Sequence, residues 1–144
     1  MVGFKINVDA ATNSVDNSFG VRVMVRDWKG SIVCASALFF PFFFSAEVAE
    51  ARTILKGVLL AGSRGLSPIA IELSLITIES DALSVVALCN GSSISRADID
   101  LVVQDILVFS SVFAVINFSF VCRQCNLIAH SLAIRVVSSK AFSC

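Results

Sequence analysis

The sequence predicts an α/β protein of the mixed α+β kind, in which one five-stranded sheet carries helices on both faces. Two observations lead to this fold class. Alternating apolar and polar residues define three strands near the N-terminus, and short turns join them. Farther along the chain, segments with helical spacing separate two more strand-like runs, and helical crossovers of this kind connect parallel strands. Both kinds of connection together predict a mixed sheet, and we expect residues 1–144 to form a single domain.

The first three strands are expected to form an antiparallel meander. Lys5–Asp9 and Gly20–Arg26 alternate regularly between apolar and polar residues, as half-buried strands do. Asn13–Asn17 supplies turn-forming residues between them. Asp27–Gly30 forms a second turn before a third, mostly apolar strand at Ser31–Phe40.

The remaining elements follow Pro41, which ends the third strand. Ser45 is the expected N-cap of a helix that runs to about Ala61, and Gly62 and Gly65 end it. The later elements are a fourth strand at Ile69–Ser80, helices at Asp81–Leu88 and Ala97–Ser110, a fifth strand at Val112–Val121 and a closing helix at Asn126–Lys140. We expect the fourth strand to lie beside the first.

A membrane protein is an alternative because 56% of the residues are hydrophobic, but the lengths of the uncharged stretches do not favour it. Ser31–Ala46 and Ile106–Cys122 are long uncharged stretches, but a spanning helix needs about 20 mostly apolar residues. Pro41 interrupts the first stretch, and serine and asparagine residues interrupt the second. We therefore expect no membrane partner.

Charge and cysteine content bound the compartment and the partners. The N-terminus lacks the apolar core of a secretory signal, and five cysteines are an odd count that suggests free thiols. We expect an intracellular protein, in the nucleus or cytoplasm, and a monomer. The 11 basic and 11 acidic residues give a net charge of zero. The composition therefore lacks the excess of basic residues that is typical of nucleic-acid-binding proteins. Binding of a polyanion would depend on local charges or metal ions.

Three acidic residues lie on or at the ends of apolar elements. Asp9 ends the first strand, Asp81 closes the fourth, and Glu50 lies on the helix face that carries Ile54 and Gly57. If the first and fourth strands are parallel neighbours, the three carboxylates converge at one edge of the sheet, where they repel one another without a cation. Oxygen ligands of this kind suit Mg²⁺ or Mn²⁺, which support phosphoryl-transfer chemistry. The alternative is three unrelated, solvated acids, as most aspartates and glutamates are.

Five segments in this order resemble the ribonuclease H-like domains. They are KINVDAA at residues 5–11, VRDWKGSIV at 25–33, AEARTILKGVLLA at 49–61, TIESDALSVV at 77–86 and VCRQCNLIAHSLA at 121–133. The chain is most similar to the divergent plant branch, whose members often derive from retroelement reverse transcriptases. The resemblance implies a mixed five-stranded sheet with strand order 3-2-1-4-5.

The resemblance also implies a function and a set of site residues. The implied activity is metal-dependent cleavage of the RNA strand in RNA–DNA hybrids, with Mg²⁺ or Mn²⁺ bound by Asp9, Glu50 and Asp81. His130 falls at the position of the family's fourth acid, and Phe120 falls where relatives place a mobile histidine. Neutral histidine is a poor ligand for Mg²⁺. Two interpretations therefore stay open: a hybrid ribonuclease, which we favour, and a catalytically inactive binding or interaction module.

The segment around Cys122 and Cys125 has several interpretations. With His130 the two cysteines match the start of a zinc knuckle, but Arg135 stands at the fourth ligand position. A C-x-x-C pair beside Arg123 is also typical of redox-active thiols, whereas the resemblance favours two incidental thiols. Arg123 and Asn126 are candidate nucleic-acid-binding residues that contact a phosphate at the start of the closing helix; alternatively, the asparagine only caps that helix.

Overall fold

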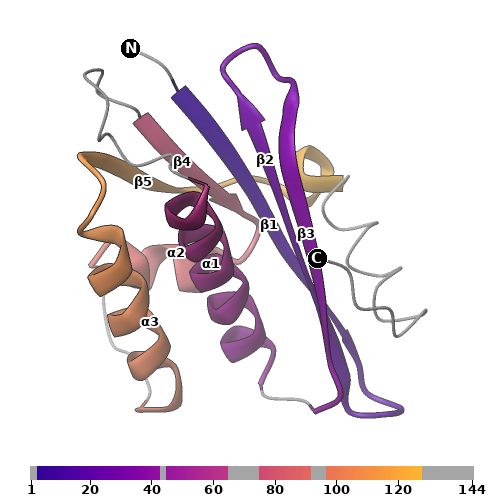
Figure 1. Ribbon diagram of the computed structural model, residues 1–144. Coiled ribbons are helices and arrows are strands. Elements are labelled where there is room, and N and C mark those ends of the chain that lie inside the picture. The colour runs from indigo at the N-terminus through magenta and orange to yellow at the C-terminus, as the bar shows by residue number, and fades with distance from the viewer. Residues whose placement is uncertain (1–2, 43–44, 65–74, 92–96, 128–144) are drawn as a thin grey trace.

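Five strands form one mixed sheet in the order β3-β2-β1-β4-β5 (Figure 1). The computed structural model describes residues 3–42, 45–64, 75–91 and 97–127. Its strands are β1 (Gly3–Asn13), β2 (Ser18–Asp27), β3 (Ile32–Phe40), β4 (Leu75–Ser80) and β5 (Val115–Phe120). The first three strands pair antiparallel, whereas β4 runs parallel to both β1 and β5. The predicted mixed sheet and its strand order are confirmed.

The turn between β2 and β3 forms for reasons visible in the sequence. The Asp27 carboxylate accepts hydrogen bonds from the backbone N–H groups of Lys29 and Ser31, both at 2.9 Å. Gly30 adopts a φ of 86°, a left-handed conformation that costs little without a Cβ atom. The turn therefore fixes the register of the hairpin.

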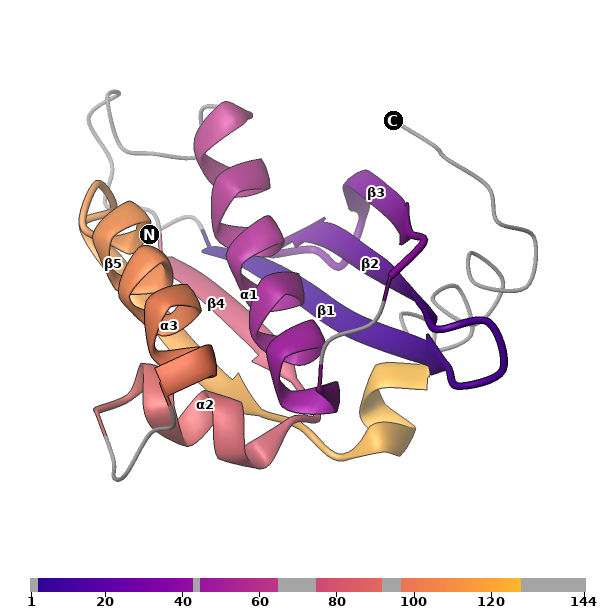
Figure 2. The ribbon, with the colours of Figure 1, turned by 90° about the horizontal axis from the view of Figure 1, so that it is seen from below.

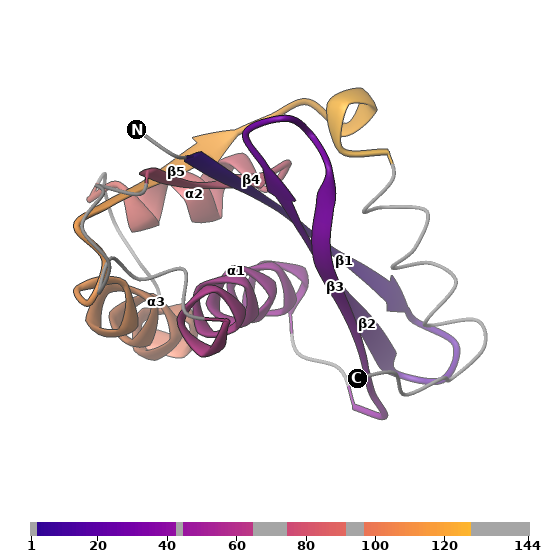
Figure 3. The same cartoon turned by 45° about the horizontal axis from the view of Figure 1, so that its top comes forward.

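Three described helices lie on one face of the sheet (Figure 3). They are α1 (Ala46–Ser63), α2 (Leu83–Cys89) and α3 (Ala97–Ser110). The Ser45 hydroxyl accepts a hydrogen bond from the Val48 N–H at 3.3 Å, which confirms the predicted N-cap of α1. None of the described helices is long and apolar enough to cross a membrane.

A close approach of α1 to β1 sets the position of the helix over the sheet. A Cβ atom added to Gly57 would lie 3.0 Å from Val8 Cγ1 and 3.3 Å from Ile6 Cγ2. Both side chains are fully buried, and Ile54 and Val58 of the same helix join their cluster. A side chain at residue 57 would push the helix outward, so the glycine allows the inner face of α1 to rest on β1.

The observed elements differ from the predicted ones mainly at their ends. β1 continues past Asp9 to Asn13, because the four additional residues pair with β2. The β4 strand begins at Leu75, and the predicted strand residues 69–74 lie outside the described part of the chain. After β5, Arg123–Asn126 form a 3₁₀ helix, η1, which lies beside β1 (Figure 2). The predicted closing helix lies outside the described residues beyond Leu127, as does any cover it gives to the second face of the sheet.

Candidate metal centre

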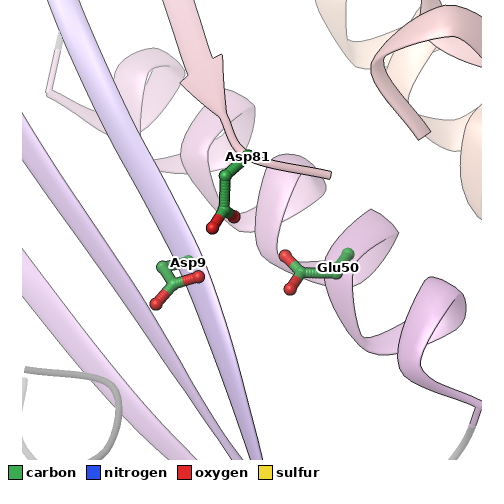
Figure 4. Close-up of side chains that lie close together, drawn as sticks. All are labelled: Asp9, Glu50 and Asp81. Atoms are coloured by element: carbon green, nitrogen blue, oxygen red, sulfur yellow. The ribbon is translucent and has the colours of Figure 1, made fainter. Parts of the chain in front are cut away.

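Three carboxylates from separate elements converge at one place on the sheet. Asp9 comes from β1, Glu50 from α1, and Asp81 follows the last residue of β4 (Figure 4). One oxygen of each side chain lies within 4.8 Å of the others. The structure therefore brings together the three acids that the sequence singled out.

The fold places each of these acids through its packing. Asp9 pairs across the sheet with Arg22 of β2 and is buried, with 1% of its surface exposed. Glu50 lies two helical turns before Gly57, on the face of α1 that the glycine allows to approach β1. The parallel pairing of β4 with β1 ends at Asn7 and Glu79, so Asp81 follows within two residues of the paired region. Two neighbouring strands and a helix thus bring together residues that are far apart in the sequence.

The electrostatics of Glu50 reflect this crowding. The pKa of its carboxyl group is raised to about 8, chiefly by burial and additionally by the nearby charges of Asp9 and Asp81. A hydrogen bond from the Ala10 backbone and the charge of Arg123 act on the pKa in the opposite direction. The Oε2 atom of Glu50 is buried and has no hydrogen-bond partner among the described residues. A buried acceptor without a partner is costly, and a cation bound by this carboxylate would offset that cost.

This donor set fits a hard divalent cation. All three ligands are carboxylates, and such oxygens suit Mg²⁺, Mn²⁺ and Ca²⁺ better than softer metals. A cation would offset the repulsion among the acids and would give Glu50 Oε2 a partner that the described part of the chain does not supply. Among the described residues this is the only group of three or more potential metal ligands.

Arg123 extends the site at its rim. Its Nε atom lies 3.4 Å from Asp81 Oδ2, and its side chain is 71% exposed. An exposed ion pair of this kind adds little to stability. Most of the Arg123 side chain therefore stays accessible to solvent next to the acidic cluster. The sequence predicted a functional role for Arg123, but it gave no indication of the pairing with Asp81.

Asn126 is buried against β1. Only 2% of its surface is exposed, and its Nδ2 atom donates a hydrogen bond to the Val8 carbonyl at 2.8 Å. Its Oδ1 atom accepts from Asn7 Nδ2 at 3.4 Å. The side chain faces β1. The helix that it was expected to cap lies beyond the described residues, and its contact with a phosphate stays a prediction. It ties η1 to the residue that precedes Asp9.

Sequence reasoning also missed a polar network on the same strand. Asn7 is almost fully buried and donates a hydrogen bond to Glu79 at 2.8 Å, and Arg26 donates to Asn7. Lys5 completes the network with an ion pair to Glu79 at 3.2 Å. The alternation of Lys5–Asp9 indicated that these side chains share a face. It could not indicate that residues 79 and 126 meet them there.

The other predicted site residues have separate outcomes. Phe120 ends β5 opposite Ser80, and 47% of its surface is exposed. His130 and Arg135 lie outside the described residues. The role of His130 as a fourth site residue therefore stays a prediction. Cys122 and Cys125 are both exposed, and their sulfur atoms lie 3.0 Å apart.

Comparison with solved structures defines the class of the protein. The fold matches the N-terminal RNase H domain of a Mycobacterium tuberculosis protein with a TM-score of 0.83 and 20% identity, covering 96% of each chain. It matches RNase H1 of Halobacterium salinarum with a TM-score of 0.83 and 16% identity, covering 96% of this chain and 99% of that one. A compost-derived RNase H1, solved in complex with an RNA/DNA hybrid, matches with a TM-score of 0.79 and 15% identity over 95% and 98% of the two chains. The chain therefore has an RNase H-like fold.

The family follows from the sequence itself. The model of the reverse transcriptase-like family matches residues 7–136, so the chain belongs to that family. No curated protein sequence matches the chain. The plant and retroelement origin expected from the resemblance stays a prediction.

Proposed function

We propose that this domain binds RNA–DNA hybrids and hydrolyses their RNA strand, using Mg²⁺ or Mn²⁺ held by Asp9, Glu50 and Asp81. The observation that carries the proposal is the convergence of three carboxylate oxygens within 4.8 Å of one another. The fold class supports the choice of substrate, since one structural neighbour was solved with an RNA/DNA hybrid. The foamy viral protease-reverse transcriptase, also solved with such a hybrid, matches with a TM-score of 0.60 and 12% identity over 96% of this chain and 19% of that one.

The three acids have a common task in this proposal, which is to bind the cation in a fixed place. They project from a strand, a helix and the end of a neighbouring strand, so packing of the core holds them in position before any ligand arrives. When bound, a divalent cation lowers the pKa of a water molecule and neutralises charge on the scissile phosphate. The buried position of Asp9 keeps bulk water from screening its charge.

Arg123 is the proposed phosphate contact beside this centre. Its guanidinium carries several N–H donors in a planar fork, a geometry that matches phosphate oxygens. Its Nε atom lies 3.4 Å from Asp81 Oδ2, so a phosphate that approaches the acids would come near the guanidinium. Asn126 is a positioning residue in this arrangement, because its hydrogen bond to the Val8 carbonyl anchors the turn that carries Arg123.

A catalytically inactive hybrid-binding module is the second candidate function. Phe120 favours it, because the family resemblance implies a histidine at this exposed strand end and phenylalanine transfers no proton. Such a module would keep the acidic cluster and the fold but lack turnover.

Hydrolysis of a labelled RNA–DNA hybrid in Mg²⁺ and in Mn²⁺ separates the two candidates. We expect the wild-type protein to cleave the RNA strand and Asp81→Asn to lower the rate by at least about a hundredfold, since it removes a charged ligand. Asp105→Asn, on the exposed side of α3, is the matched control and should cleave like the wild type. Hybrid binding without cleavage by the wild type, in both metals, would favour the inactive module.

A further inference from the structure

Cys122 and Cys125 flank the start of η1 in a geometry that favours bond formation between them. Their Sγ atoms lie 3.0 Å apart, and both residues are exposed. The Cys125 N–H donates to the Cys122 carbonyl at 2.9 Å, which closes a turn of four residues. Turns of this kind bring their first and last Cα atoms within about 7 Å, near the range that disulfides span. An S–S bond of about 2.05 Å then requires the sulfur atoms to move by only about 1 Å.

The two thiols are chemically unequal. The hydrogen bond from the Cys125 thiol lowers the pKa of Cys122, and the backbone N–H groups of Cys125 and Gln124 lower it further. The same thiol–thiol hydrogen bond raises the pKa of Cys125. In a thiol pair with this asymmetry, the thiol of lower pKa is suited to attack another disulfide first, and the second thiol is suited to attack the mixed disulfide that results.

The other described cysteines lack these features. Cys89 is buried in the core, and desolvation raises the pKa of its thiol to about 12. Cys34 is partly buried on β3. Reactivity follows exposure and thiolate content, so these residues serve as internal references for Cys122 and Cys125.

We propose that Cys122 and Cys125 are a reversible modification site, at which a low-molecular-weight disulfide such as oxidised glutathione converts the two thiols into an intramolecular disulfide. The Cys122 thiolate attacks one sulfur of the small disulfide, forms a mixed disulfide and releases one small thiol. The Cys125 thiolate then attacks Cys122 Sγ, forms the Cys122–Cys125 bond and releases the second small thiol. The protein loses two electrons and two protons, and the small disulfide gains both as it becomes two thiols.

The turn that carries the two cysteines is joined to the acidic cluster, but the proposed modification does not depend on nuclease activity. Arg123 lies between the two cysteines and pairs with Asp81, and Asn126 anchors the same turn to Val8. Oxidation therefore cross-links the turn that carries Arg123. The modification is defined by the thiols alone, so its test stands apart from the test of hydrolysis.

Treatment of the reduced, folded protein with oxidised glutathione tests the proposal. After the remaining thiols are alkylated, denaturation and trypsin cleavage after Arg123 place the two cysteines on different peptides. We expect mass spectrometry to find these peptides joined by a disulfide that dithiothreitol reverses, with Cys34 and Cys89 alkylated. Recovery of Cys122 and Cys125 as alkylated thiols, or equal glutathione modification of all described cysteines, would overturn the proposal.

Two variants test the order of the steps. Cys125→Ser removes the second attacking thiol, so a stable glutathione adduct should accumulate on Cys122. Cys122→Ser should form its glutathione adduct several times more slowly than Cys125→Ser does, since backbone N–H groups lower the pKa of the Cys122 thiol whereas the charge of Glu79 raises that of Cys125. Cys34→Ser should leave the disulfide yield unchanged. An equally rapid reaction of Cys122→Ser and Cys125→Ser would contradict the assigned roles.

Discussion

At the scale of single residues, the charge state of Glu50 depends on its burial and on the acids around it. Burial and the neighbouring acids raise the pKa of its carboxyl group from 4.5 to about 8. Between these two values the folded protein holds a proton that the unfolded chain has released. The free energy of unfolding therefore falls as the pH rises through this window, by at most about 1.4 kcal/mol per pH unit.

The first prediction concerns this pH dependence. In the presence of a chelator, the free energy of unfolding of the wild type should fall between about pH 5 and pH 8, while Glu50→Gln should lack this component of the slope. Added Mg²⁺ should flatten the wild-type slope, because a bound cation stabilises the carboxylate form. Urea denaturation at several pH values measures both effects. A Glu50→Gln slope equal to that of the wild type would contradict the burial of a repelled carboxyl group.

The second prediction concerns Arg123. If its guanidinium contacts a phosphate, Arg123→Gln should weaken hybrid binding and lower the slope of log affinity against log salt by about one. Arg64→Gln is a matched control, because Arg64 is an exposed arginine at the C-terminal end of α1. Filter binding or anisotropy at several salt concentrations gives the slopes. Identical slopes for Arg123→Gln and the wild type would remove the phosphate contact from the proposal.

At the scale of secondary-structure elements, the contact between η1 and β1 holds two parts of the candidate site together. The paired part of β1 and β4 ends at Asn7 and Glu79, and the carbonyl of the next residue, Val8, accepts its hydrogen bond from Asn126. This contact joins residues separated by 118 positions in the sequence. It thereby connects the turn that carries Arg123 to the strand that carries Asp9.

The third prediction compares two asparagines that each donate a side-chain hydrogen bond to a backbone carbonyl. Asn126 is buried, whereas Asn90 is exposed and donates to the Phe118 carbonyl at 3.0 Å. Asn126→Ala should lower the free energy of unfolding by about 1–3 kcal/mol, because it removes a buried hydrogen bond to the Val8 carbonyl. Asn90→Ala should cost less, since water replaces the lost donor. Equal losses in urea denaturation would show that the buried contact does not anchor the turn.

The extent of β1 shows why element boundaries were harder to predict than elements. Residues 10–13 read AATN, which has no strand pattern, yet they pair with β2 over their full length. Pairing with a neighbouring strand outweighs the local preference of such residues. By contrast, the predicted bounds of α3 agree with the structure at both ends, because its apolar spacing extends over the whole helix.

At the scale of the whole molecule, the candidate site was predictable where it depends on topology. A parallel pairing of the first and fourth strands, combined with a helix face that contains Glu50 and Gly57, was sufficient to bring three acids together. The ion pair of Arg123 with Asp81 and the burial of Asn126 depend on how the chain returns to β1 after β5. No local pattern encodes that return. One hydrophobic cluster contains residues from β1, β2, β4 and each of α1, α2 and α3, which supports the proposal of a single domain.

The most direct test of the account is a calorimetric titration of the metal-free protein with Mn²⁺ and with Mg²⁺. We predict binding by the wild type that Asp81→Asn weakens by about tenfold or more, because ligand charge sets the affinity of carboxylate sites. Asp105→Asn, which removes an exposed carboxylate from α3, should bind like the wild type. Equal affinities of the wild type and Asp81→Asn, or no binding by the wild type, would contradict the claim that Asp9, Glu50 and Asp81 form a metal centre.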